Sequence, residues 1–444
     1  MPRSRNGQGR GDPSERRARL RLVTPDDPPP APRSWLQKHW RDGLIGGGLV
    51  IAVGLLGWGV VVAALADQRS ADRPEAALKI RPDDSLALAS LADRRMAAGD
   101  AAAARSLALR AIVANPMELT AFRTLAQAAA ADGRIAKADE LMTIAGRRAK
   151  RDRPAQLWLL QRRASQGRYA DAVIHADGLM RAWPIEMRGP VTRLLSAMAI
   201  DPDAGKAIAG VLATDPPWRT RFLIDLSRGT SDLAAPFTVF SALQDSRQPP
   251  RDLELQAYID RLVREGLFQA AYVTWVQLLP PKGMTGLGDL YDGGFEGLPG
   301  PPPFNWQIPR IKGGSIGLDP GPGGSGGAAL HLSFGGGAAP VVLARQLLVL
   351  PPGRYRLLGQ ARADRFDSAL GLIWTVRCAE GSRQAAGQTA RVLETAGWAP
   401  IAAEFEVRPT DCPAQWLTLE QAAGQPIATR GEVWFDDLQI LRAN

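Results

Sequence analysis

Three stretches of the chain repeat one pattern with a period of 34 residues: GDAAAARSLALRAIVANP at 99–116, GRIAKADELMTIAGRRAK at 133–150 and GRYADAVIHADGLMRAWP at 167–184. Each stretch begins with glycine and has alanine five positions later, and two of the three end in proline. Apolar residues before each glycine follow helical spacing. The pattern therefore predicts a helix that ends at the glycine, followed by a second helix that packs closely through its alanines.

This period and these small, large and proline positions resemble tetratricopeptide repeats. The resemblance implies an all-α solenoid over residues 67–281, with five or six helical hairpins, although the pattern weakens after Pro184 and returns near Gly266. A solenoid of this kind presents a concave groove, which implies a protein partner as its ligand. A second interpretation is that the repeats only raise the distal domain above a membrane.

Residues 44–66 read LIGGGLVIAVGLLGWGVVVAALA and contain no charged residue. At 1.5 Å per residue this run spans roughly 34 Å, which is enough to cross a hydrocarbon core, so it predicts a single transmembrane helix. A signal peptide cleaved after Ala66 is the alternative.

The tail at 1–43 is rich in arginine and proline and is expected to be disordered and basic. Cytoplasmic flanks carry such basic excess, so the N-terminus is predicted to lie in the cytoplasm. Residues 67–444 would then occupy the periplasm of a bacterium, anchored in its inner membrane. Orientation and contact with anionic lipid account for these arginines, and nucleic acid is not an expected partner.

Glycine, proline and alternating β-branched residues replace the alanine-rich helices over residues 282–444. Several runs alternate as strands do, for example Leu370, Leu372, Trp374 and Val376 on one face. Expected strands are 328–334, 341–349, 355–363, 370–376, 401–407, 416–421 and 433–440. Their number and spacing predict an all-β sandwich of two sheets.

The two cysteines of the chain, Cys378 and Cys412, both lie in this region. An even pair in an oxidising compartment predicts a disulfide, because each cysteine is placed at the end of an expected strand. Two free buried thiols are the alternative.

Four short motifs bracket and fill the β-region: DGGFE at 292–296, PGRY at 352–355, GW at 397–398 and VWFDDLQI at 433–440. Together they resemble the jelly-roll carbohydrate-binding modules. The resemblance implies a jelly-roll sandwich and a structural calcium ion held by Glu296, Asp436 and Asp437, for which carboxylate oxygens are suitable ligands. Solvated or capping carboxylates are the alternative, and no other cofactor is expected.

Polysaccharide binding by such a module requires aromatic faces beside polar hydrogen-bonding groups. Most tryptophans of the region are expected in the core. The candidate glycan-binding residues are Trp306, Trp374, Arg356, Gln360, Arg362 and Glu404.

Catalytic motifs appear only out of context. G-x-S-x-G occurs at 313–317 and 323–327, but both segments are expected in glycine-rich loops of a β-domain rather than in a strand–turn–helix elbow. The three histidines fall in three separate regions, so an enzyme is not expected.

The sequence thus predicts a multidomain, membrane-anchored periplasmic binding and scaffold protein that supports cell-envelope or surface-polysaccharide assembly. A protein-only scaffold without glycan binding, and an accessory subunit of a glycan-processing enzyme, are the alternatives.

Overall fold

The structure is a computed structural model that describes residues 72–322, 327–380, 384–422 and 424–443. The predicted transmembrane helix at 44–66 and the basic tail lie outside these ranges. Within them, no helix is both long enough and apolar enough to cross a membrane. Two compact units meet between Leu88 and Ala89, and the second unit contains nearly all of the helices and every strand described below.

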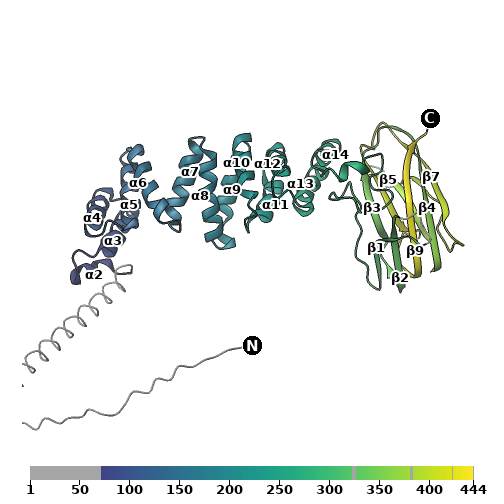
Figure 1. The fold of residues 1–444 in the computed structure, drawn as a ribbon, viewed down its shortest axis with the longest axis horizontal. Coiled ribbons are helices and arrows are strands. Elements are labelled where there is room, and N and C mark those ends of the chain that lie inside the picture. The colour runs from purple at the N-terminus through teal and green to yellow at the C-terminus, as the bar shows by residue number, and fades with distance from the viewer. Residues whose placement is uncertain (1–71, 323–326, 381–383, 423, 444) are drawn as a thin grey trace, which may run out of the picture. The chain divides into compact units, whose positions relative to one another are not determined.

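Helices occupy the first part of the described chain and antiparallel strands the second, as the sequence predicts (Figure 1). Helices α3 to α14 follow one another as successive helix–turn–helix pairs. The bounds are α2 Pro74–Ile80, α3 Ser85–Ala97, α4 Ala101–Ala114, α5 Leu119–Ala131, α6 Ile135–Arg148, α7 Arg153–Ser165, α8 Tyr169–Ala182, α9 Gly189–Met198, α10 Pro202–Leu212, α11 Arg219–Gly229, α12 Ala234–Gln244, α13 Asp252–Arg264 and α14 Phe268–Gln277.

Glycines end the first helix of a pair in the way that the repeat pattern predicts. Gly133, Gly167 and Gly266 have φ of 75°, 68° and 73°, a left-handed conformation that glycine adopts without strain. The amide after Gly133 donates to the carbonyl of Ala129, which closes the helix terminus as a Schellman motif. Gly266 shows that the repeat does return after the weak stretch.

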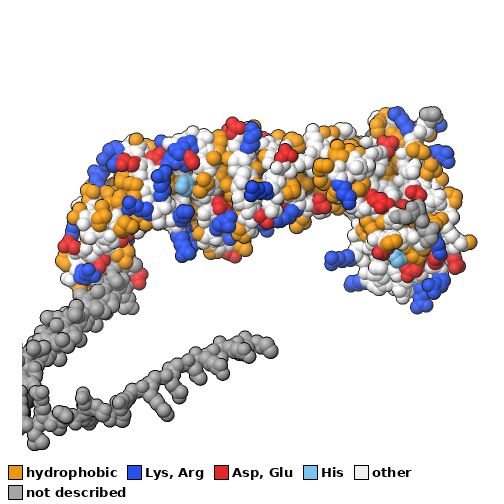
Figure 2. Space-filling model, in the orientation of Figure 1, with side chains coloured by type: hydrophobic (Ala, Val, Ile, Leu, Met, Phe, Trp, Pro, Cys, Tyr) orange, Lys and Arg blue, Asp and Glu red, His pale blue; other side chains and the backbone are white. Residues whose placement is uncertain are grey.

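Small residues hold the paired helices together. Ala104, Ala138 and Ala172 are fully buried, as the close packing of the second helix requires. The exposed sides of the helices carry acidic and basic side chains interspersed with hydrophobic ones (Figure 2). The predicted close packing of the second helix through its alanines is therefore confirmed.

Nine strands form two antiparallel sheets in the second part of the described chain. The five-stranded sheet has the order β1-β2-β9-β4-β7, and the four-stranded sheet has the order β3-β8-β5-β6. The bounds are β1 Gly314–Pro320, β2 Ala328–Ala339, β3 Val342–Leu348, β4 Gly353–Ser368, β5 Leu372–Cys378, β6 Ala385–Gln388, β7 Ala399–Val407, β8 Gln415–Gln421 and β9 Ile427–Arg442.

Two of these strands were not expected from the sequence. The segment 313–317 was expected to be a loop, but its residues from Gly314 onward form β1, which pairs with β2 from Gly314–Phe334 to Pro320–Ala328. The loop prediction was wrong because hydrogen bonding to β2, and not the β-propensity of its own residues, makes this segment an edge strand. The other unexpected strand, β6, has only four residues and pairs with β5.

The last helix packs directly on the start of the β-region. Trp275 of α14 is buried against Tyr291 and Phe304, with ring centroids 4.8 and 5.7 Å away. Its indole nitrogen donates to the carbonyl of Pro301 at 2.9 Å. One hydrophobic core therefore continues from α14 into the sandwich.

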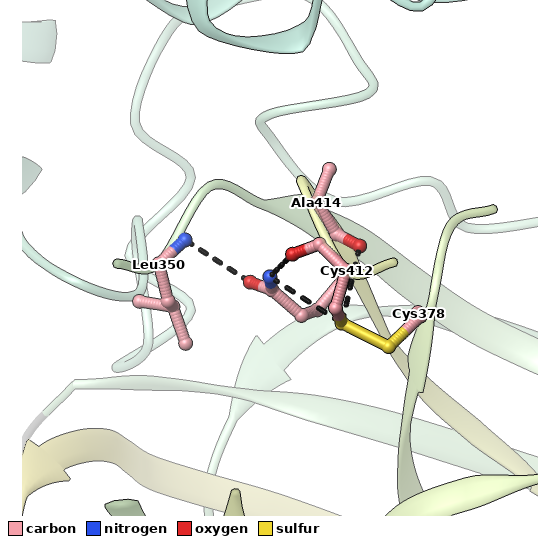
Figure 3. The surroundings of a disulfide bond; sticks show 5 residues. Leu350, Cys378, Cys412 and Ala414 are labelled. Carbon is pink, nitrogen blue, oxygen red and sulfur yellow. Dashed lines mark hydrogen bonds between the residues drawn. A yellow bond between two sulfur atoms is a disulfide. The ribbon is translucent and has the colours of Figure 1, made fainter. Parts of the chain in front are cut away.

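The disulfide prediction is confirmed. Cys378 at the end of β5 is bonded to Cys412, which precedes β8, and their Cα atoms are 5.0 Å apart (Figure 3). Beside the bond, the side chain of Gln415 accepts from the amide of Leu350 and donates to the carbonyl of Cys412. The bridge thus joins the end of β5 to the segment just before β8, its neighbour in the four-stranded sheet, near the loop that follows β3.

Candidate functional site

A row of side chains crosses the outer face of the five-stranded sheet. His331 of β2 and Arg362 of β4 are the two cross-strand neighbours of Trp434 of β9. The inward-facing neighbours of these residues, such as Leu332, Val433 and Ala363, fill the core, so alternation turns the row toward solvent. We call this row, together with Trp398 and the adjacent carboxylates of Asp319, Asp364 and Glu432, the platform.

Hydrogen bonds fix one end of the platform. His331 Nδ1 lies 2.9 Å from Asp319 Oδ2, and Nε2 lies 2.5 Å from Glu432 Oε2. Ser333 Oγ donates to the other Glu432 oxygen at 2.9 Å. The imidazole is therefore held between two carboxylates, and the serine hydroxyl is directed at Glu432 and not at the histidine.

The other end of the platform is built around one backbone carbonyl. Arg362 Nη1 and Trp398 Nε1 both donate to the oxygen of Pro322, each at 3.2 Å. Arg362 also binds Asp364 through Nη2 at 2.8 Å. Gly321 lets this chain segment approach, because a Cβ there would lie 3.3 Å from the Trp398 ring.

Trp434 is covered on its two sides. The His331 ring stacks on it with a centroid distance of 4.7 Å and parallel planes, and the guanidinium of Arg362 lies 6.0 Å from its centroid. This arrangement leaves polar edges toward solvent. The platform can therefore offer hydrogen-bond donors and acceptors on a rigid surface, with Trp398 as the half-exposed aromatic ring at its margin.

Two predicted glycan-binding residues are in the wrong place for that role. Trp374 is fully buried and packs edge-to-face on Phe435, and Trp306 is 8% exposed and packs on Trp374 and Phe295. Both predictions were wrong because large apolar side chains on alternating strands fill the space between the two sheets.

The four polar candidates do lie on the outer face. Arg356 of β4 is opposite Glu404 of β7, 3.7 Å apart, in an exposed ion pair. Gln360 lies between Pro400 and Asp436 in the register of the sheet. Of the four, only Arg362 belongs to the row that contains Trp434.

The carboxylates predicted to hold calcium gather where the start of the β-region meets β9. The amide of Leu438 donates to the carbonyl of Gly293 at 2.9 Å, which joins the two segments. Burial raises the pKa of Asp436, and the neighbouring carboxylates of Asp437 and Glu296 raise it further. In the described ranges, no three His, Cys, Asp or Glu side chains are arranged to hold a metal ion, so the calcium site stays a prediction.

Asp292, which the sequence interpretation did not assign, organises this same corner. Its carboxylate accepts hydrogen bonds from the amides of Glu296, Gly297 and Leu298 at 2.9–3.1 Å. Burial raises the pKa of the Asp292 carboxyl, which these amides partly offset. The turn that presents Glu296 is therefore fixed by one buried carboxylate.

A groove opens between the first helices of two successive pairs, α9 and α11, beside the turn at Ile185–Met187. Its volume is about 740 Å³. Ile185 and Ile200 are exposed in it, and polar and charged side chains surround them. The charged lining residues are Glu186, Arg188, Arg193, Arg221 and Asp225.

Comparison with known proteins gives structural similarity only. The sandwich is similar to carbohydrate-binding modules. A family 4 carbohydrate-binding module is 15% identical, with 32% of this chain and 88% of that chain covered and a TM-score of 0.25. The xylan-binding CBM22-1 domain of Xyn10C from Paenibacillus barcinonensis is 14% identical, with 31% and 87% covered and a TM-score of 0.23.

A third similar structure is PilF of Pseudomonas aeruginosa, which is 13% identical, with 49% of this chain and 92% of that chain covered and a TM-score of 0.21. No family model and no curated protein matches the chain. At these scores the similarities carry no argument about what the chain binds.

The sequence interpretation missed His331, Glu432, Asp319 and Asp364 as parts of one surface. His331, Glu432 and Asp364 each lie one position from a buried residue on an alternating strand, which is a usable signal for an outward side chain. Asp319 has no such signal, because its neighbours Leu318 and Pro320 on β1 are exposed. Which outward residues are neighbours depends on the pairing of β2 with β9 and of β9 with β4. The sequence of a single strand does not determine which strand it pairs with.

Proposed function

We propose that the chain is a binding scaffold whose platform holds a neutral polysaccharide. The observation that supports this proposal is the row of His331, Trp434 and Arg362 across three strands, with Trp398 sharing the Pro322 carbonyl with Arg362. Sugar hydroxyls both donate and accept hydrogen bonds, and this surface supplies donors and carboxylate acceptors side by side.

The charges of the platform favour a neutral ligand over an anionic one. Asp319, Asp364 and Glu432 contribute three carboxylates beside the single guanidinium of Arg362 and one imidazole. A uronate or phosphate chain would meet like charges there, which disfavours its binding. The ion pairs also hold the side chains in place before the ligand arrives, which reduces the entropy cost of binding.

Affinity electrophoresis of the full chain in gels that contain soluble polysaccharides tests the proposal. We expect retardation by at least one neutral polysaccharide, and loss of retardation in Arg362→Ala and in Trp398→Ala. Arg345→Ala is the matched control, because Arg345 also lies over a tryptophan, Trp416, but on the four-stranded sheet. Equal retardation of all variants, or retardation only by uronate-containing chains, would refute the platform as the site.

We infer binding and not catalysis for this surface. The Ser333 hydroxyl donates to Glu432 and not to His331, so the imidazole is not placed as the general base of a serine–histidine pair. An accessory subunit of a glycan-processing enzyme is the alternative, and copurification of a hydrolase or transferase activity with the chain would favour it.

The groove between α9 and α11 is proposed to hold a segment of a protein partner. Exposed Ile185 and Ile200 offer apolar contacts, and the surrounding charges of both signs offer orientation. Ile200→Asp should abolish capture of such a partner while leaving polysaccharide retardation unchanged. A scaffold that binds protein only would capture the protein partner but would not be retarded by any polysaccharide.

The membrane anchor at 44–66 and the periplasmic position of residues 67–444 are part of the proposal. A disulfide in the sandwich agrees with an oxidising compartment. Alkaline phosphatase fused after residue 281 should be active in bacterial cells, because that enzyme requires an oxidising environment. Activity only in an N-terminal fusion would reverse the proposed orientation.

A further inference from the structure

A run of exposed cations lies at the end of α6 and in the turn before α7. Arg147, Arg148, Lys150, Arg151 and Arg153 fall within seven residues, and all five are exposed. The one acidic residue of the run, Asp152, is directed elsewhere. Its carboxylate accepts from the Ala155 amide and binds Arg123 Nε at 3.0 Å.

Among the residues that the structure describes, Arg147, Arg148, Lys150, Arg151 and Arg153 form no ion pair. Arg148 donates a hydrogen bond to the sulfur of Met117 at 3.8 Å. Basic residues in the last turn of α6 complement its helix dipole. Arg153, however, is the first residue of α7, where the same dipole disfavours a cation. Helix stability therefore accounts for Arg147 and Arg148 but not for Arg153.

Exposed apolar side chains lie on α4 and in the turn after it, and one of them, Met117, contacts a cation of the run. Leu109 and Val113 are four residues apart on α4 and so share one face of the helix, and they are 51% and 85% exposed. Met117, in the turn after α4, is 64% exposed and contacts Arg148. Asn115 Oδ1 accepts from the Met117 amide and fixes this turn. Hydrophobic and basic side chains are interspersed over α4 to α7 in Figure 2.

We propose that this edge, composed of Leu109, Val113, Met117 and the cations of 147–153, docks on a bilayer surface that carries anionic phospholipid. Uncompensated cations next to exposed aliphatic side chains match the two layers of such a surface, phosphate headgroups and acyl chains. Each cation near an anionic bilayer raises the partition ratio about five-fold. Salt weakens the attraction. This docking is independent of the platform and of any polysaccharide.

A single reporter cysteine tests the proposal in the full chain. Both natural cysteines are consumed by the disulfide, so Val113→Cys is the one free thiol of its variant and takes an environment-sensitive fluorophore selectively. The labelled chain is incorporated into nanodiscs of phosphatidylcholine alone, or of equal parts phosphatidylcholine and phosphatidylglycerol. Copurification with the disc shows that the anchor is inserted in the bilayer. The emission of the fluorophore shows whether the edge docks on the bilayer surface. A chain that does not copurify is mixed with preformed discs and read in the same way.

We expect blue-shifted, brighter emission in the anionic discs only, reversed by added salt. Neutralising Arg147, Lys150 and Arg151 to glutamine should lower the ratio of docked to undocked chains roughly a hundred-fold. The matched control neutralises three exposed cations of the β-region, Arg310, Lys312 and Arg408, and should leave the signal unchanged. A label at exposed Leu393→Cys should not respond to either lipid.

Emission that is the same in both discs overturns the proposal, as does an anionic-lipid response that survives the triple neutralisation. A response to soluble polyglutamate, without one to anionic discs, would assign the edge to an acidic protein instead and would also overturn it. Unchanged helical circular dichroism of each variant shows that the fold is intact.

Discussion

The guanidinium of Arg219 lies 2.9 Å from the carboxylate of Glu254, and the two side chains are 1% and 0% exposed. The pair joins α11 to α13, two first helices of successive hairpins. Arg219 also donates to the carbonyls of Leu212, Gln248 and Pro249, and Glu254 accepts from the Thr220 hydroxyl. A buried ion pair is thus fully hydrogen-bonded in the part of the solenoid where the 34-residue pattern is weakest.

Removing one partner of this pair should be strongly destabilising. Arg219→Leu leaves the Glu254 carboxylate buried without its closest cation, with only half-exposed Arg251 at 3.7 Å, and breaking a buried pair in this way typically costs about 3–5 kcal/mol. Urea unfolding followed by circular dichroism measures the loss. Arg221→Ala, which breaks an exposed pair with Asp225 on the same helix, is the control and should change stability by less than about 1 kcal/mol. Equal effects of the two substitutions would contradict the importance of burial here.

Overpacking should reveal the helix contacts of the repeats. Ala138 is fully buried, so Ala138→Leu forces the α6 contact apart and should cost about 1–3 kcal/mol. Ala104→Leu and Ala172→Leu should behave alike. Ala102 of α4 is exposed, and Ala102→Leu should leave the midpoint of thermal unfolding nearly unchanged. No drop for any of the three buried sites would be incompatible with the packing described above.

Loss of the disulfide should destabilise the sandwich. Cys378 and Cys412 are 34 residues apart, and closing a loop of that size is worth roughly 3–4 kcal/mol in the chain-entropy model. The double variant Cys378→Ser/Cys412→Ser should therefore unfold at lower denaturant, as tryptophan fluorescence of the β-region would show. Mass spectrometry of non-reduced peptides checks the bond itself. Alkylation of both thiols without prior reduction would mean that the bond is absent.

The helical repeats should lose stability under mild acid. Burial lowers the pKa of His175 below 6.5, and nearby Arg163 lowers it further, while its Nδ1 lies 2.6 Å from the Gln156 side chain. The unfolded chain then takes up the proton more readily than the folded one. Stability supplied by the neutral ring is present above the unfolded pKa and is lost as the pH falls toward the lower folded pKa.

Denaturant titrations between neutral and mildly acidic pH measure that loss. His175→Gln keeps a polar side chain beside Gln156 but cannot titrate, so the pH slope of its stability should be smaller than that of the natural chain. An identical slope in the two proteins would exclude His175 as the source.

Calcium should stabilise the β-region if Glu296, Asp436 and Asp437 hold the ion. Binding to the folded state alone raises the unfolding temperature in proportion to the logarithm of the free calcium concentration. Calorimetry with and without calcium measures the shift, and Glu296→Gln should remove it. Glu404→Gln, an exposed carboxylate on β7, is the control. No calcium response in the natural protein would leave these three side chains as interacting carboxylates without a metal role.

The sequence alone determined the features that depend on neighbours along the chain. Gly133 and Gly167 marked helix ends because a left-handed residue is needed there, and buried alanines marked the partner helix because spacing along one helix sets its face. Strand alternation placed Leu372, Trp374 and Val376 on one face for the same local reason, but only the structure showed that this face is the inner one and that Trp374 is buried. The two cysteines were paired because no other cysteine competes.

Tertiary structure decided what depends on residues that are far apart in the chain. His331 and Glu432 are 101 residues apart in the sequence, yet they hydrogen-bond because β2 and β9 are adjacent in one sheet. Gly314 is part of a strand only because its backbone pairs with Phe334 of β2. The cations at 147–153 can be read from the sequence, but only the structure shows that Asp152, the one carboxylate among them, pairs with Arg123 instead. Long-range pairing sets these contacts, and no local pattern encodes it.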